Sequence, residues 1–297
     1  MTSVSNIDEV MMKSSIKCLI TLITSLVLPA HGASVWKISS DNSHIFLGGT
    51  IHVLSPEDYP LPSAYDQAYQ SADVVVFETN LNALNQGRFQ RQLQSVMMLP
   101  NDDKLHQYLD KITFMRLSDY LARHQIPYSR VENFTPAALS FFLTLQALNE
   151  FGMTQEGVDL HFAKKAQQDG KTQLWLETPE EQIALLNSLN HIGANTIIHY
   201  TLDDINDLPS TMTKIKKSWR SGKLEALNEN EIMEFKTDYP DVYYALLTQR
   251  NAQWAPQIKQ MLNTPQIEFI MVGALHLAGP DSVLRTLSEQ GYRIEQW

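Results

Sequence analysis

Short apolar runs and long amphipathic stretches alternate along the 297-residue chain, and the two patterns predict different elements. Six short runs rich in Val, Ile, Leu and Phe predict strands. They lie at residues 35–38, 45–47, 74–77, 173–176, 267–272 and 292–296. The cluster Asp41-Asn42-Ser43 predicts a hairpin turn between the first two, because Asx side chains favour turns.

The stretches between these strands carry apolar residues at helical spacing. One stripe is Phe89, Leu93, Val96 and Met97, and another is Leu247, Trp254, Ile258 and Met261. Ser55-Pro56, Thr135-Pro136 and Thr178-Pro179 are typical helix starts, and Glu181 completes a capping box with Thr178. The predicted fold is therefore α/β (α+β), with a small, largely parallel central sheet and helical insertions at about 80–170 and 182–263.

The first 32 residues have the pattern of a secretory signal peptide. Lys13 and Lys17 precede the apolar run 18–28, and Ala30-His31-Gly32 follows it. The run is too short for a membrane span, which needs about 20 residues. We expect cleavage after Gly32 or Ala33, export to the periplasm or the medium, no stable membrane anchor afterwards, and a single domain over 33–297. A buried N-terminal helix is the weaker alternative.

Two short patterns each occur twice. Residues 45–52 form a predicted strand that runs into Gly-x-x-His at His52, and residues 270–276 repeat this at His276. A second pair of strands ends in Glu-Thr, at Glu78 and at Glu177. Because the carboxyl ends of parallel strands share one edge of a sheet, the four side chains are expected to converge.

Two imidazoles and two carboxylates form a competent ligand set for a divalent metal ion. A carboxylate that is not a ligand can act as general base toward metal-bound water. Each residue also has an ordinary explanation, since single strand-end His and Glu residues are usually structural and Glu177 directly precedes a capped helix. The repetition favours a metal site at His52, Glu78 and His276 and, with weaker support, at Glu177.

Arg250 is a further candidate. It lies between Leu247 and Trp254 at helical spacing, which places a cation on an apolar stripe. Such a cation needs a carboxylate partner or an anionic ligand, so Arg250 is either a catalytic residue or a salt-bridged structural one.

The net charge and the cysteine count exclude several classes of binding partner and metal site. The formal charge of −10 disfavours nucleic acid and anionic membranes, which bind clustered Lys and Arg. The one cysteine, Cys18, falls inside the predicted signal peptide, which limits a metal site to nitrogen and oxygen ligands. The sequence lacks Gly-x-Ser-x-Gly, His-Glu-x-x-His and Walker-type motifs.

The order and spacing of these motifs resemble the TraB/GumN family, which includes Tiki-type proteins. The resemblance runs from Trp36 to Tyr292, through the stretches 49–52, 77–80, 176–182, 250–251 and 273–277. It implies an erythromycin-esterase/ChaN-like fold with pseudo-symmetric halves and, in the Tiki branch, metal-dependent peptide cleavage that favours Mn²⁺ or Co²⁺, with Zn²⁺ also possible. By matching positions, the two Gly-x-x-His histidines of the family are His52 and His276, and the acidic strand-end residue is Glu78. For Glu177 and Arg250 it supports membership of the site without fixing a role.

The leading hypothesis is a secreted metallopeptidase with a peptide or protein substrate. In it His52, His276, Glu78 and Glu177 bind the metal, and Glu78 and Arg250 act in catalysis. One rival is a non-catalytic periplasmic protein that binds a peptide, haem or a metal ion. Another is an ester or lactone hydrolase with the same mechanism. The sequence does not fix the oligomeric state.

Overall fold

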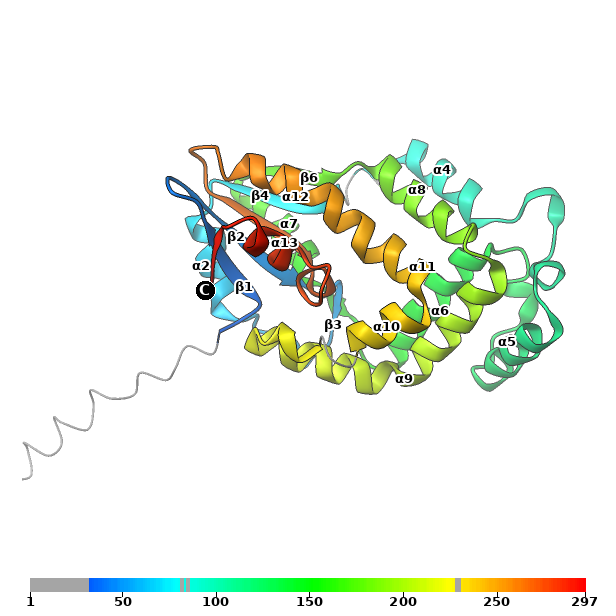
Figure 1. The fold of residues 1–297 in the computed structure, drawn as a ribbon. Helices are drawn as coiled ribbons and strands as arrows, with labels where there is room; N and C mark the ends of the chain where they lie inside the picture. Colours follow the sequence, from blue (N-terminus) through cyan, green and yellow to red (C-terminus); the bar gives the residue numbers. More distant parts are fainter. Residues whose placement is uncertain (1–31, 81–82, 84–85, 228–230) are drawn as a thin grey trace, which may run out of the picture. The chain divides into compact units, whose positions relative to one another are not determined.

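All six predicted strands are present, and they form one sheet (Figure 1). The computed structural model describes residues 32–297 apart from 81–82, 84–85 and 228–230, so the predicted signal peptide lies outside the described residues except for Gly32. Residues Gly32–Trp297 make one compact unit. No helix among the described residues is long and apolar enough to cross a membrane.

The strand order across the sheet is β6-β4-β7-β2-β1-β8. Strands β6, β4, β7 and β2 run parallel, while β1 is antiparallel to β2 and to β8. The fold prediction of a small, largely parallel sheet is confirmed. The bounds are Val35–Ser39 (β1), His44–Thr50 (β2), Val74–Thr79 (β4), Thr172–Glu177 (β6), Glu268–Gly273 (β7) and Arg293–Gln296 (β8).

The hydrophobic pattern explains which strands are central. Residues 74–77 of β4 and 269–272 of β7 are buried on both faces, as continuous apolar runs of parallel strands require. The hairpin between β1 and β2 forms as predicted, with the Ser40 amide donating to the Ser43 carbonyl at 3.0 Å. A short antiparallel pair, β3 (Val53–Leu54) and β5 (Gln155–Glu156), was not predicted, because two-residue strands leave no periodic signal.

Both insertions are helical. The first, between β4 and β6, contains α4 (Gly87–Met97), η2 (Pro100–Asp102), η3 (Leu105–Tyr108), α5 (Lys111–Arg123), η4 (Tyr128–Arg130), α6 (Pro136–Glu150) and α7 (Val158–Asp169). The second, between β6 and β7, contains α8 (Pro179–Asn190), α9 (Ala194–Ser221), η5 (Leu224–Leu227), α10 (Met233–Asp238), α11 (Pro240–Tyr243), the π-helical segment η7 (Tyr244–Thr248) and α12 (Gln249–Met261). Elsewhere lie η1 (Pro56–Asp58), α2 (Ser63–Ser71), η8 (Ala274–Leu277) and α13 (Val283–Glu289).

Two of the three predicted helix starts cap full helices. The Thr135 hydroxyl accepts from the amide of Ala138 in α6, and Thr178 and Glu181 form the predicted capping box of α8. Ser55-Pro56 begins only the three-residue turn η1, in which the Ser55 amide donates to the Asp58 carboxylate at 2.8 Å. The hydrogen bond joins the last residue of the turn to the residue before it, and the backbone is extended again at Tyr59.

The insertions have a hydrophobic core of their own. Leu117, Leu139 and Leu202 bring α5, α6 and α9 together in a cluster separate from the core around the sheet. Near its C-terminal end, α9 returns to the sheet, where the indole of Trp219 donates to the Gly49 carbonyl at 2.9 Å. Figure 1 shows α9 passing from the far helices back toward the strands. The insertion therefore braces the end of β2, where the Gly-x-x-His motif begins.

Candidate functional site

Four parallel strands bring the four predicted residues to one edge of the sheet. Glu177 is the last residue of β6, Glu78 lies one residue before the end of β4, His276 follows β7 in η8, and His52 follows β2. Because the strand order is β6-β4-β7-β2, the side chains are arranged across the edge as Glu, Glu, His, His. The two Glu-Thr strands are neighbours, and so are the two Gly-x-x-His strands.

The guanidinium of Arg250 links the two acidic strand ends. Its Nη2 atom lies 2.6 Å from Oε2 of Glu78 and 2.9 Å from Oε2 of Glu177. Burial is the largest single influence on Glu78 and raises its pKa, but the positive charge of Arg250, together with the two histidines and the Gly273 amide, lowers the pKa of Glu78 to about 2. Glu78 is therefore ionised at neutral pH.

Both carboxylate oxygens of Glu177 accept hydrogen bonds from surrounding side chains. Its Oε1 atom accepts from Nε of Arg250 at 2.8 Å and from the indole of Trp254 at 2.9 Å, and Gln182 donates to Oε2. The Trp254 ring also lies beneath Arg250, with the guanidinium carbon 4.6 Å from the ring centroid. Arg250 and Trp254 are four residues apart on α12 and share a face, as their spacing predicts. A π-helical segment, η7, directly precedes this helix, a deviation that is frequent at functional sites.

His276 is buried and held in one tautomer. Asn251 donates its amide to the Asp281 carbonyl at 2.8 Å, which turns its oxygen toward Nδ1 of His276 at 2.7 Å. The hydrogen-bond pattern therefore assigns the proton to Nδ1 and leaves the lone pair on Nε2, which faces Nη1 of Arg250 at 3.1 Å. Burial lowers the pKa of His276 to about 3, so the ring is neutral.

His52 is the exposed member of the set, with 60% of its side chain accessible. Its Nδ1 atom lies 3.2 Å from Oδ1 of Asp159, a residue of α7. The negative charge of Asp159 raises the pKa of His52 above its ordinary value. Nδ1 of His276 thus has a hydrogen-bonded oxygen partner, the arrangement that orients Nε2 of metal-binding histidines, whereas Nδ1 of His52 lies at ion-pair distance from Asp159 without a hydrogen bond between them.

Three side chains of the site approach one another around Gly273. A methyl group added to this glycine would lie 3.3 Å from Oε1 of Glu78, 3.4 Å from Cδ2 of His276 and 3.7 Å from Nε2 of His52. The Gly273 amide also donates to Oε1 of Glu78 at 2.6 Å. Side chains from three strand ends therefore converge on one point that only a glycine keeps free.

The donor atoms are of the kinds that bind a divalent ion, but the guanidinium of Arg250 contacts one of them, Nε2 of His276. Donors on one ion lie about 3–4 Å apart, since each is about 2.1 Å from it, and Nε2 of His276 lies 4.0 Å from Oε1 of Glu78. Within the described ranges, no three His, Cys, Asp or Glu side chains already stand in metal-binding geometry. A bound ion would have to replace Arg250 at Nε2 of His276.

Similarity to known sequences gives the family. Residues 34–296 match the TraB/PrgY/gumN family, which is nearly the whole of the described chain. The chain belongs to this family. The TraB/PrgY/gumN motifs predicted from the sequence are the segments that supply the site, from residues 49–52 at the end of β2 to residues 273–277 after β7.

Relatives within the TraB/PrgY/gumN family are distant. The uncharacterized protein YbaP of Escherichia coli (strain K12) is 24% identical over 83% of this chain and 88% of YbaP. Metalloprotease TIKI2 of Danio rerio is 25% identical over 84% of this chain and 58% of the fish protein, and metalloprotease TIKI2 of Xenopus tropicalis is 24% identical over 84% of this chain and 57% of its own length. The chain thus spans little more than half of the TIKI2 proteins. No solved structure gives a significant match.

Three residues of this TraB/PrgY/gumN site were missed by sequence reasoning. Asp159 lies at ion-pair distance from His52, Asn251 orients His276, and Trp254 donates a hydrogen bond to Glu177. The sequence predicts Trp254 only as part of an apolar stripe, and Asn251 only as part of the stretch 250–251 that resembles the family. Asp159 lies in the first insertion, far from any motif in sequence, and the nearby His161 packs instead against Tyr59 and Phe162.

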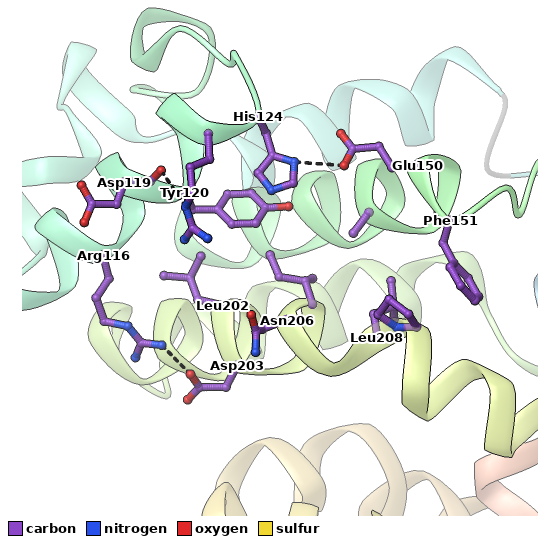
Figure 2. A pocket seen from close by; sticks show the side chains of 14 residues that line it. Arg116, Asp119, Tyr120, His124, Glu150, Phe151, Leu202, Asp203, Asn206 and Leu208 are labelled. Carbon is purple, nitrogen blue, oxygen red and sulfur yellow. Dashed lines mark hydrogen bonds and ion pairs between the residues drawn. The ribbon is translucent and has the colours of Figure 1, made fainter.

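The helical insertions contain a separate cavity. It has a volume of about 610 Å³ and lies between α5, α6 and α9 (Figure 2), and none of its lining residues belongs to the site at the sheet edge. Tyr120 stacks on His124 there, with ring centroids 4.2 Å apart, and His124 pairs with Glu150 at 2.9 Å. The Tyr120 hydroxyl is buried without a hydrogen-bond partner among the described residues.

Proposed function

We propose that the chain is a secreted, metal-dependent hydrolase that cleaves peptide bonds. The observation that carries the proposal is the convergence of His52, Glu78 and His276 around Gly273. The similarity to proteins named metalloprotease TIKI2 supports the peptidase class. The pattern of the first 32 residues supports export.

Three side chains would hold the ion: His52 and His276 through Nε2, and Glu78 through Oε1. All are nitrogen or oxygen donors, which suit Mn²⁺, Co²⁺ or Zn²⁺. When bound, such an ion supplies Lewis-acid chemistry that activates water near neutral pH. A carboxyl group with a pKa of about 2 is a poor proton acceptor, so Glu78 serves better as a ligand than as the general base.

Glu177 receives a different role from the one its motif suggested. Both of its oxygens already accept hydrogen bonds, from Arg250, Trp254 and Gln182. We assign it as the residue that positions Arg250. The guanidinium, held at the sheet edge, would then orient a substrate carboxylate or stabilise the negative charge that develops on a cleaved carbonyl.

The function is tested by peptide-library digestion with purified protein and each of Mn²⁺, Co²⁺ and Zn²⁺, followed by mass spectrometry. We expect new peptide termini with wild type and none with His52→Ala or His276→Ala. His191→Ala is the matched control, because His191 is exposed at the end of α8. Metal binding without new termini under any condition would favour the rival, a binding protein of this family.

A further inference from the structure

The two edges of the sheet differ in chemistry. Strand β8, at one edge, carries Arg293 and Glu295, which form an exposed ion pair at 2.8 Å. Charged residues on an edge strand discourage pairing with another chain. Strand β6, at the other edge, has no charged residue before its last position, and Leu174 and Trp175 are 42% and 41% exposed. These two neighbours alternate in direction, so both faces of the β6 edge are open.

The backbone of this edge is also largely free. Strand β6 pairs with β4 on its inner side. Outside that ladder, the one hydrogen bond to the β6 backbone among the described residues runs from the side-chain amide of Gln257 to the Leu176 carbonyl, at 3.0 Å. The segment 172–175 therefore offers peptide groups and exposed apolar side chains to an added strand.

The edge leads into the candidate site. In the register of the sheet, Trp175 lies opposite Phe77 and Glu177 lies opposite Thr79, the residue after Glu78. At about 3.3 Å per residue, Trp175 is about 7 Å from Glu177 along the strand. A chain paired with β6 would thus run directly to Glu177 and Arg250.

We propose that β6 is the docking strand for an extended peptide substrate, which binds by main-chain pairing along residues 172–175 and enters the site past Glu177. A second copy of this chain is the less suitable occupant, because two chains of charge −10 repel each other. The inference rests on the proposed peptidase function for the choice of ligand. Main-chain pairing supplies affinity with little dependence on sequence, so the substrate is defined chiefly by being unfolded.

Binding is tested without turnover, on the full chain in the presence of a chelator. The probe is a fluorescein-labelled peptide, acetyl-Lys-Thr-Val-Thr-Val-Thr-Lys-amide, measured by fluorescence anisotropy. A second peptide with its five central backbone nitrogens methylated keeps the side chains and the charge but loses the donors. We expect methylation to weaken binding about tenfold or more, and hydrogen exchange of residues 173–176 to slow when the first peptide binds.

Leu174→Lys is the test variant on the protein side, and Leu145→Lys is its control, since Leu145 on α6 is equally exposed at 42%. We expect Leu174→Lys to weaken peptide binding about fivefold or more and Leu145→Lys to change it less than about twofold. Equal binding of the methylated peptide, equal effects of the two variants, or a wild-type dimer that Leu174→Lys dissociates would each overturn the inference. Binding without cleavage would instead count against the peptidase function alone.

Discussion

Asn251 fixes the chemical form of His276. Its side-chain oxygen lies 2.7 Å from Nδ1 of the imidazole, and its own amide is anchored to the Asp281 carbonyl. Asn251 directly follows Arg250 on α12, so a single helix supplies both the cation and the residue that orients His276.

We expect Asn251→Ala to weaken Mn²⁺ binding by about 10–100-fold, because loss of the Nδ1 partner frees the ring to rotate and to change tautomer. Asn251→Asp retains an oxygen acceptor and should bind within about tenfold of wild type. Isothermal titration calorimetry measures both variants. An Ala variant that binds Mn²⁺ as wild type does would remove Asn251 from the site.

Gly273→Ala should fold normally yet lose metal binding. The backbone at Gly273, with φ −49° and ψ 135°, accepts an alanine, but the new methyl group would fill the space between Glu78, His276 and His52. Gly49→Ala is the control, because a methyl group there meets Ala274 and Ser34 at a similar 3.3 Å without touching a polar site atom. Circular dichroism checks folding, and metal titration checks the site. Equal metal binding by the two variants would contradict the assignment.

The metal-free protein should lose stability as the pH falls below about 6.5. His276 has a pKa of about 3 in the folded chain against an ordinary 6.5, so in this window the unfolded chain binds a proton that the folded chain does not. The contribution of His276 is about 1.4 kcal/mol per pH unit at most, and Glu78 adds to the loss below pH 4.5. Urea unfolding at pH 7, 6 and 5 measures it. His276→Gln should show a shallower dependence, and an unchanged slope would argue against a buried neutral His276.

Tyr120 and Tyr65 should respond in opposite ways to the same change. The Tyr120 hydroxyl is buried without a described partner, so Tyr120→Phe is expected to leave the free energy of unfolding unchanged or to raise it slightly. The Tyr65 hydroxyl contacts the carbonyls of Ser34 and Gly49 and the indole of Trp219. Tyr65→Phe should therefore cost about 1–3 kcal/mol. A large loss in Tyr120→Phe would indicate a partner that the structure does not contain.

If the chain is exported and processed, we expect the mature protein to begin at Ala33. Cleavage after Gly32 keeps Ala33, which is fully buried and whose carbonyl accepts from the amide of Val35 at 2.7 Å and from Gln296 at 3.1 Å. Cleavage after Ala33 would remove both contacts. N-terminal sequencing of the exported protein decides between the two positions, and a mature chain that begins before Lys17 would reject processing altogether.

The strands and helix starts could be predicted because short sequence patterns mark them. Apolar runs gave the six strands to within about three residues, and Thr178 with Glu181 marked a helix start. The convergence of the strand ends followed from the repeated motifs and the parallel order. The partners of those residues were not predictable, because Asp159 reaches His52 from a helix more than a hundred positions away, and no sequence periodicity encodes such a contact.

Arg250 bears on whether the chain can fold without a bound metal ion. Glu78 and Glu177 are both largely removed from water, and a lone buried carboxylate pair would oppose folding. The guanidinium neutralises part of that charge, so the protein can fold before it acquires an ion. Once His52 has given up its proton, one dication cancels the charges of Glu78, Glu177, Asp159 and Arg250 together. Under the proposed function, charge neutrality at the sheet edge would thus favour a dication over a monovalent ion.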